Sequence, residues 1–187
     1  MKEYKRTYPL FSLCGLNCGL CPRYQANGAS KCPGCGGPNF HLKHPTCAVI
    51  TCNKKHHGVE FCFQCSLYPC KKYSKPSKVD SFISYRNVIT DFNKADKEGI
   101  DKYKIELDEK VRILEFLIKS YNDGKRKSFY CIAVNLLDLT AIRSIIEQID
   151  KKISKQNMNI KGKIKLVIDL FESKAKEENI DLRLRKK

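Results

Sequence analysis

The sequence predicts a small, metal-stabilised, loop-rich cysteine module followed by an all-α helical domain. Ten of the eleven cysteines precede residue 71, whereas regular apolar periodicity begins only near residue 79. Between Cys14 and Cys70, Gly, Pro, Cys and Asn recur every few residues without a helical or strand period, which indicates loops. We therefore expect a cysteine-rich metal-binding module over residues 1–75 and a helical domain with a charged C-terminal tail over residues 76–187.

Three Cys-x-x-Cys pairs dominate the first module. This spacing lets two thiolates reach one ion from a single tight turn, and the Pro and Gly residues in the turns suit that conformation. A looser Cys-x4-Cys pair joins them, so eight thiolates are available for two tetrahedral zinc ions: Cys18, Cys21, Cys32, Cys35, Cys47, Cys52, Cys62 and Cys65. Cys14 and Cys70 remain as flanking ligands or as buried thiols.

The sequence leaves open which pairs share an ion. A nested arrangement would join the pair at 32 and 35 to that at 47 and 52, and would close 18 and 21 with 62 and 65. This nesting brings the two ends of the module together, and we favour it. His44, His56 and His57 are alternative ligands, although exposed histidines in basic loops are the more common outcome.

Coordination is expected to supply much of the folding free energy of this module. Its apolar residues follow no regular pattern, and a structural zinc can contribute on the order of 10 kcal/mol. In a reducing cytoplasm, clustered thiols are more often metal ligands than disulfides. Cys131 differs from the others, because it stands alone in an apolar run and is expected to be a core residue.

Iron is the alternative to zinc. The spacing of Cys14, Cys18 and Cys21 is the one that radical enzymes using S-adenosylmethionine place on an iron–sulfur cluster. Such enzymes need most of a barrel after this motif, whereas more cysteines and then helices follow here. A radical enzyme is therefore disfavoured, while an iron–sulfur cluster without that chemistry, or a thiol redox role, stays an alternative.

The second part of the chain is predicted to be helical. After a polar connector at 71–80, apolar residues recur every three or four positions from Ile100 to Tyr121, and a turn at 122–124 ends this helix. A buried helix is expected at 129–137, although a strand fits that run too, and amphipathic helices follow at 139–149 and 160–171. We expect a further short helix near 80–92 and a charged tail from Lys174 that frays.

The formal net charge of +16 raises the question of nucleic-acid binding. Basic stretches at 54–57 and 71–72, with tyrosines nearby, suit such a role. However, lysine outnumbers arginine 28 to 8, and arginine is the preferred bidentate reader of phosphate. We therefore favour a solvated lysine-rich surface over a nucleic-acid interface.

Two observations concern the cellular location. No segment approaches the roughly 20 consecutive apolar residues that span a bilayer. Residues 1–11 contain no apolar run long enough for a signal peptide. We expect a cytoplasmic protein without membrane contact.

Three sequence blocks resemble one known family. They are CGLNCGLCP from Cys14 to Pro22, CPGC from Cys32 to Cys35, and GVEFCFQCSLYPC from Gly58 to Cys70. Together they look like the domain-of-unknown-function 3795 family of cysteine-rich prokaryotic proteins, over about residues 10–75. A looser resemblance to helical tails of some members covers 123–131. The resemblance implies a presumed zinc-binding domain, with a further cysteine pair like Cys47 and Cys52, and no established activity.

The favoured role is a zinc-stabilised interaction or regulatory module. In this hypothesis the metal fixes loops that present aromatic side chains to a protein partner: Phe61, Phe63, Tyr68 and Tyr73. The competing interpretation is that these rings pack over the metal sites.

Catalysis is not favoured. A catalytic zinc normally keeps an open position and a nearby general base, whereas Glu60 is the only carboxylate between the first and last clustered cysteines. Cys14 or Cys70, if left uncoordinated, would be the candidates for a reactive thiol.

Overall fold

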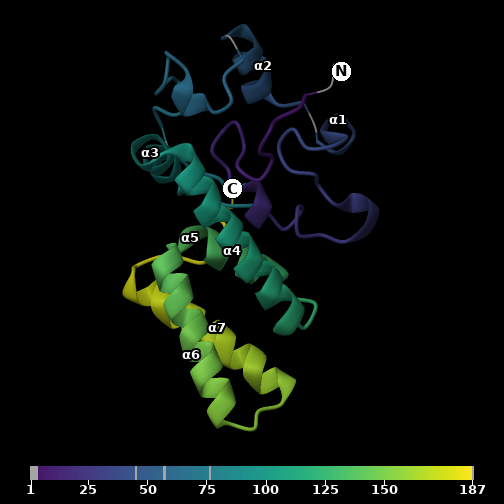
Figure 1. The fold of residues 1–187 in the computed structure, drawn as a ribbon, viewed down its shortest axis with the longest axis vertical. Helices are drawn as coiled ribbons and strands as arrows, with labels where there is room; N and C mark the ends of the chain where they lie inside the picture. The colour runs from purple at the N-terminus through teal and green to yellow at the C-terminus, as the bar shows by residue number, and fades with distance from the viewer. Residues whose placement is uncertain (1–3, 45, 57, 76, 187) are drawn as a thin grey trace.

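The computed structural model describes residues 4–44, 46–56, 58–75 and 77–186. Within these ranges the chain forms seven α-helices and three short 3₁₀-helices, and no strand. The cysteine-rich segment occupies one end of an elongated molecule, and the hairpin of α6 and α7 forms the other end (Figure 1). The predicted all-helical second part, with a loop-rich first part, is confirmed.

The cysteine-rich segment consists mainly of turns. Its regular elements are short: η1 (Cys18–Leu20), η2 (Gly28–Ser30), α1 (Phe40–Lys43), α2 (Ala48–Lys55) and η3 (Cys62–Gln64). Two of the three Cys-x-x-Cys pairs coincide with 3₁₀-helices, η1 and η3. The local structure is therefore organised around the cysteines.

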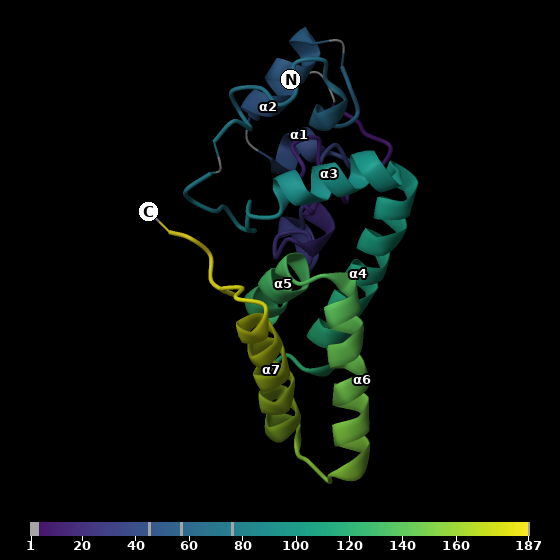
Figure 2. The ribbon, with the colours of Figure 1, turned by 90° about the vertical axis from the view of Figure 1, so that its left-hand side faces the viewer.

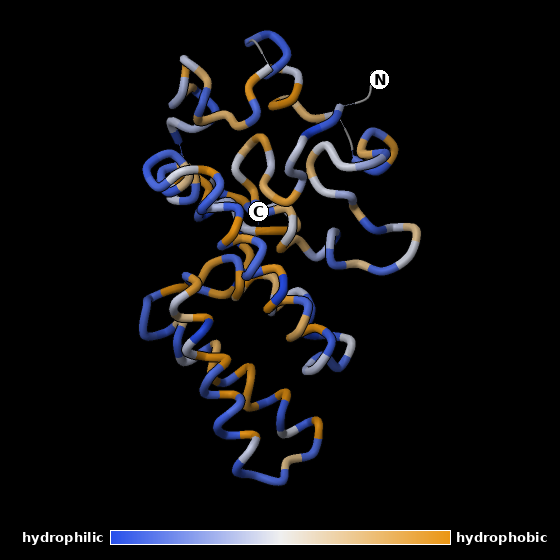
Figure 3. The backbone as a smooth tube through the Cα atoms, viewed as in Figure 1, coloured by the Kyte–Doolittle hydropathy of each residue, from blue (hydrophilic) through white to orange (hydrophobic). Residues whose placement is uncertain are grey.

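The helical part contains α3 (Val88–Glu98), α4 (Ile100–Ser120), α5 (Lys127–Leu136), α6 (Leu139–Lys155) and α7 (Ile160–Glu177). The long α4 contacts both α3 and α5, and α6 packs along α7 (Figure 2). Side chains cap the last two helices, since Asp138 accepts from the Ala141 amide at 2.7 Å and Asn159 from the Gly162 amide at 2.9 Å. Hydrophobic and hydrophilic residues alternate along α4, α6 and α7 (Figure 3), as amphipathic helices require.

Helices expected around 100–121, 129–137, 139–149 and 160–171 correspond to α4, α5, α6 and α7, and the strand alternative for 129–137 is wrong. The helix expected near 80–92 begins only at Val88. Before it, the Asp80 carboxylate accepts from the Tyr85 amide at 2.9 Å, and the Ser84 hydroxyl accepts from the Arg86 amide at 3.2 Å. These side chains replace helical hydrogen bonds and stabilise turns instead.

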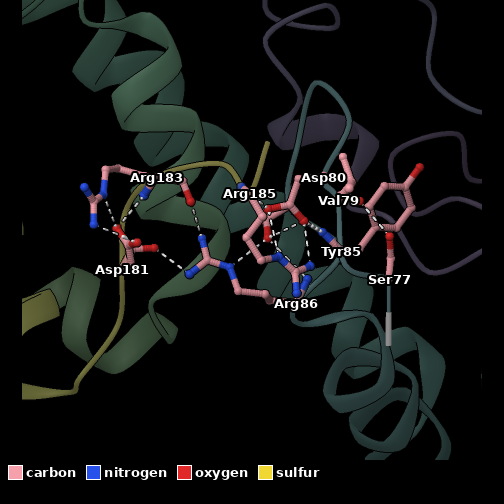
Figure 4. Close-up of polar contacts among 9 residues, drawn as sticks. Ser77, Val79, Asp80, Tyr85, Arg86, Asp181, Arg183 and Arg185 are labelled. Carbon is pink, nitrogen blue, oxygen red and sulfur yellow. Dashed lines mark hydrogen bonds and ion pairs between the residues drawn. The ribbon is translucent and has the colours of Figure 1, made fainter. Parts of the chain in front are cut away.

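The C-terminal segment does not fray, contrary to expectation. Helix α7 continues to Glu177, and the chain turns at Asn179, whose φ is 56°. The Ile180 amide donates to the Ala175 carbonyl at 2.7 Å, which closes the helix end. The tail then returns to the connector, where the Asp80 amide donates to the Arg185 carbonyl at 2.9 Å (Figure 4).

One hydrophobic core joins the two parts of the chain. Phe11, Leu20 and Phe61 from the cysteine-rich segment are buried in the same cluster as Phe92 of α3 and Tyr103 of α4. The cysteine-rich segment therefore relies on α3 and α4 for its apolar burial.

Two further expectations concern the helical part. Cys131 is fully buried in α5, as expected for a core residue. No helix in the described part of the chain is long and apolar enough to cross a membrane.

Candidate metal centre

All three Cys-x-x-Cys turns are attached to one short segment, residues 9–13. The Cys35 amide donates to the Pro9 carbonyl at 3.0 Å, the Gly19 amide to the Leu10 carbonyl at 2.9 Å, and the Cys62 amide to the Leu13 carbonyl at 2.9 Å. Three turns that are up to 44 residues apart in sequence, from 18 to 62, thus converge on five consecutive residues.

The first and third turns have nearly the same backbone conformation. In each, the second cysteine donates its amide to the carbonyl of the first at 3.1 Å. The second cysteines, Cys21 and Cys65, have φ/ψ of −76°/136° and −76°/135°. Both turns share the pattern Cys-x-x-Cys-x-x-Tyr, a short repeat that the pairing of cysteines alone does not reveal.

The second turn depends on glycine. Gly34 has a φ of +81°, and a Cβ atom there would lie 2.6 Å from the Pro9 carbonyl oxygen. This turn therefore packs its backbone directly against the anchoring segment, which only glycine permits.

Four cysteines surround one small cavity of about 30 Å³: Cys52, Cys62, Cys65 and Cys70. His56 also lines this cavity. Such a volume is that of a single water molecule or ion. Cys70, whose role the sequence leaves undecided, thus belongs to the same group as the third Cys-x-x-Cys pair.

A second group of thiols lies around a larger cavity of about 990 Å³, which is lined by Cys14, Cys21, Cys32, Cys35 and Cys47. Cys18 belongs to this group by its electrostatic environment. Burial raises the pKa of the Cys18 thiol well above its usual value, and the neighbouring thiols of Cys35, Cys14, Cys21 and Cys32 raise it further.

The thiols that raise the pKa of Cys18 include those of Cys32 and Cys35, which the favoured nesting assigns to the other ion. Which cysteines share an ion stays a prediction. Cys47 and Cys52 lie on different cavities, because Cys47 precedes α2 and Cys52 lies within it.

The thiols of Cys35 and Cys62 are held in an environment that favours their protonated form. Burial raises the pKa of both Cys35 and Cys62 to about 11. A divalent metal must therefore displace protons from these thiols, so its affinity should rise with pH.

Arg6 is an important residue that sequence reasoning missed. Its side chain is only 1% exposed and bonds to Glu60 at 3.2 Å. The guanidinium also donates to the carbonyls of Phe11 at 2.6 Å and Glu60 at 2.7 Å. Its charge lowers the pKa of Cys35 against the effect of burial. No local pattern marks Arg6, since its partners lie up to 54 residues away.

Glu60 is consequently engaged as the partner of Arg6, and Thr7 donates to its carboxylate at 3.2 Å. Its role is to fix the third turn against the N-terminal segment.

All eleven cysteines are free thiols. Across the described ranges, no three His, Cys, Asp or Glu side chains are grouped so that they could hold a metal ion as they stand. The donor set nevertheless suits a thiophilic ion, because soft thiolates select zinc, copper(I) or iron–sulfur clusters. The cysteines therefore suit such an ion by their chemistry, and coordination requires the thiols to move closer together around it.

The aromatic residues expected to face a partner are turned inward. Phe61 is buried, and the rings of Phe63, Tyr68 and Tyr73 surround Phe92 at centroid distances of 5.2, 5.8 and 5.7 Å. This cluster attaches the third turn to α3. Phe61 is therefore unavailable to a partner, whereas Phe63, Tyr68 and Tyr73 are only partly buried, and their contact with a partner stays a prediction.

The remaining candidate residues have less distinctive positions. His44 is exposed and lines the larger cavity, whereas His57 lies outside the described residues. Lys54 and Lys55 are exposed at the end of α2, whereas Lys72 lines the larger cavity.

Comparison with known proteins supports the resemblance seen in the sequence. Residues 10–75 match the model of a family described as "Protein of unknown function (DUF3795)". No match was found among curated proteins or among solved structures. The matched segment begins at the anchoring segment and ends after the last clustered cysteine, so it contains both groups of thiols.

Proposed function

We propose that this chain is a zinc-binding protein in which two thiolate centres stabilise an interaction or regulatory module on a helical domain. One ion would be held by Cys52, Cys62, Cys65 and Cys70. The other would be held by the first two Cys-x-x-Cys pairs: Cys18, Cys21, Cys32 and Cys35. Cys14 and Cys47 would lie beside the second centre as alternative ligands.

The observation that carries this proposal is the small cavity lined by four cysteines. Four thiolates complete the tetrahedral shell of a structural zinc and leave no open position for water. A closed shell favours a structural over a catalytic role. The raised pKa values of Cys35 and Cys62 are consistent with thiols that become charged only when an ion compensates them.

Coordination would join segments that the backbone leaves loosely connected. The ion at the small cavity would tie α2 to the third turn and to Cys70, and the other ion would tie the first turn to the second. Because these segments contain few regular hydrogen bonds, most of their order would derive from the metal.

Elemental analysis of protein purified without air tests the proposal. We expect two zinc ions per chain and a colourless solution. Cys65→Ser and Cys21→Ser should each reduce the zinc content to about one, because each variant removes a ligand from one centre. Cys131→Ala is the matched control, since this thiol lies in α5, and it should retain both ions. Zinc contents that do not depend on Cys65 and Cys21 would refute the proposal.

An iron–sulfur centre is the second candidate, supported by one observation. The thiols of Cys14 and Cys21 are both close enough to Cys18 to raise its pKa, so the three-cysteine motif converges. A brown protein with stoichiometric iron and sulfide would establish this candidate over zinc.

A further inference from the structure

The larger cavity has much more room than a metal centre needs. Its volume is about 990 Å³, at the upper end of the roughly 300–1,000 Å³ typical of small-molecule sites. Apolar side chains from α2, the connector and α3 form much of its lining: Val49, Ile50, Phe82, Ile83, Val88 and Ile89. Phe82 is 59% and Ile89 39% exposed, so apolar surface is open to solvent here.

The charged residues around this cavity are all positive. Its described lining contains six cationic side chains and no carboxylate: Arg23, Lys43, Lys72, Lys75, Arg86 and Arg185. Two zinc ions with four thiolates each would carry a charge of about −4 in total. Asp80 pairs with Arg185 at 2.8 Å, so the six cations exceed by about one the charge that this carboxylate and both metal centres, counted in full, could neutralise.

Arg185 is held in position by a buried carboxylate. Its Nε and NH2 atoms bond to Asp80 at 3.3 and 2.8 Å (Figure 4). The Asp80 side chain is 0% exposed and does not line the cavity. This ion pair fixes the C-terminal tail against the connector, so the tail supplies part of the cavity wall.

Arg86 is fixed by neutral acceptors. Its Nε donates to the Ser84 hydroxyl at 3.0 Å, and its terminal nitrogens donate to the carbonyls of Asp181 at 2.5 Å and Arg183 at 2.8 Å. Both guanidiniums are thus pre-organised beside one another. Burial lowers the pKa of Arg86, the charge of Asp80 opposes this effect, and the charge of Arg185 adds to it.

Donors remain available on both guanidiniums. Each guanidinium has five N–H donors, of which Arg86 uses three and Arg185 uses two with described partners. Pre-organised guanidiniums with free donors are well suited to bind phosphate or carboxylate groups in a bidentate manner.

We propose that this cavity binds a small organic anion whose phosphate or carboxylate group contacts Arg86, Arg185 and Lys72 while its apolar body contacts Phe82, Ile83 and Ile89. The site rests on the zinc-binding function proposed above, because five of the clustered cysteines line the same cavity. Metal binding and anion binding would therefore be coupled through shared walls, which suits a regulatory module.

Two fluorescent probes with closely related ring systems test the proposal on the full-length, zinc-loaded protein. Anilinonaphthalene sulfonate carries an anionic group, and phenylnaphthylamine lacks it. We expect the anionic probe to bind at one site and about tenfold more tightly than the neutral probe, as expected for a charge-assisted contact. Equal affinities of the two probes would overturn the proposal.

Variants locate the site. Lys72→Gln and Arg86→Gln should each weaken binding of the anionic probe about three- to tenfold. The matched controls are Lys71→Gln, in the same loop but outside the cavity, and Arg183→Gln, whose side chain is exposed. Both controls should change the affinity less than about twofold. Arg86→Gln also removes contacts to the tail, so this variant could fail to fold. In that case Lys72→Gln remains decisive, because Lys72 is exposed. Unchanged affinity of the Lys72→Gln protein would overturn the assignment.

Competition with naphthyl phosphate and naphthoate distinguishes the two acid groups. A competitor that displaces the probe at about tenfold lower concentration identifies its own acid group as the preferred one, and failure of both to displace it would overturn the proposal. Zinc analysis of the same samples separates the two hypotheses. Two zinc ions without charge-dependent probe binding would refute the anion site alone, whereas protein without zinc would refute the proposed function.

Discussion

Asn17 connects the first cysteine turn to three helices at once. Its carboxamide is 3% exposed and donates to Asp91 of α3 at 3.0 Å and to Asn135 of α5 at 3.1 Å. It also accepts from the Tyr103 hydroxyl of α4 at 2.9 Å. Because Asn17 directly precedes Cys18, this side chain links the cysteine-rich segment to the helices.

We expect Asn17→Ala to destabilise the protein strongly. The substitution removes three hydrogen bonds and leaves the carboxyl of Asp91, the phenol of Tyr103 and the amide of Asn135 each with one bond fewer. Each buried polar group left unsatisfied costs about 1–3 kcal/mol. Since Asp91 and Asn135 can partly rearrange, we expect a total loss of about 3–5 kcal/mol in the free energy of unfolding.

Urea unfolding at neutral pH, followed by circular dichroism, measures this loss. Asn53→Ala is the matched control, because Asn53 is also buried but donates only to the Val59 carbonyl, at 3.0 Å, within the cysteine-rich segment. Its substitution should cost about 1–2 kcal/mol. If Asn17→Ala costs no more than Asn53→Ala, the hydrogen bonds of Asn17 do not link the two parts as we argue.

Three further predictions follow from particular contacts. Gly34→Ala should lower the free energy of unfolding by at least about 2 kcal/mol and weaken zinc binding. The control is Gly28→Ala, which should cost only about 1 kcal/mol, because Gly28 has a φ of +74° but open space around it. Equal losses of stability in thermal unfolding would contradict the close packing of Gly34 on Pro9. Burial raises the pKa of Asp91 to about 6. The folded state therefore holds the Asp91 proton more tightly than the unfolded state does. The contribution of this proton to stability is present below about pH 4 and is lost as the pH rises towards 6. Asp91→Asn should flatten stability against pH in that range, and an unchanged slope would show that another group causes it. Chelation should abolish amide protection over residues 10–75 but preserve it in α5, α6 and α7; protection that survives metal removal would refute metal-dependent folding of the module.

The helices illustrate what local sequence can predict. The three- and four-residue spacing of apolar residues in α4 arises because one face of the helix must be buried, so the pattern is visible within the segment itself. The start of α3 and the docked tail depend instead on Asp80, which pairs with Arg185 at a separation of 105 residues. Such a contact leaves no periodic signal, and a charged tail resembles any other solvated segment.

The candidate site also combines features that the local sequence predicts with features that depend on distant contacts. The Cys-x-x-Cys spacing indicates candidate ligands, because two thiolates on one turn could share an ion. It does not identify which turns meet, because that depends on backbone bonds to residues 9–13. Tertiary packing likewise places Cys47, just before α2, and Cys52, within α2, on different cavities. It also buries Arg6.

Shared burial makes the cysteine-rich segment and the helices energetically dependent on each other. If the module loses order, Phe11 and Phe61 leave the core cluster and expose Phe92 and Tyr103 on α3 and α4. The buried residues of α5, α6 and α7 retain neighbours of their own, because Tyr130 packs against Phe171 with a centroid distance of 6.3 Å. Ligands that bind only the folded module therefore stabilise α3 and the first half of α4 most. Through Asn17 and the docked tail, zinc and an anion in the larger cavity would act on the same helices, and this coupling is what a regulatory module requires.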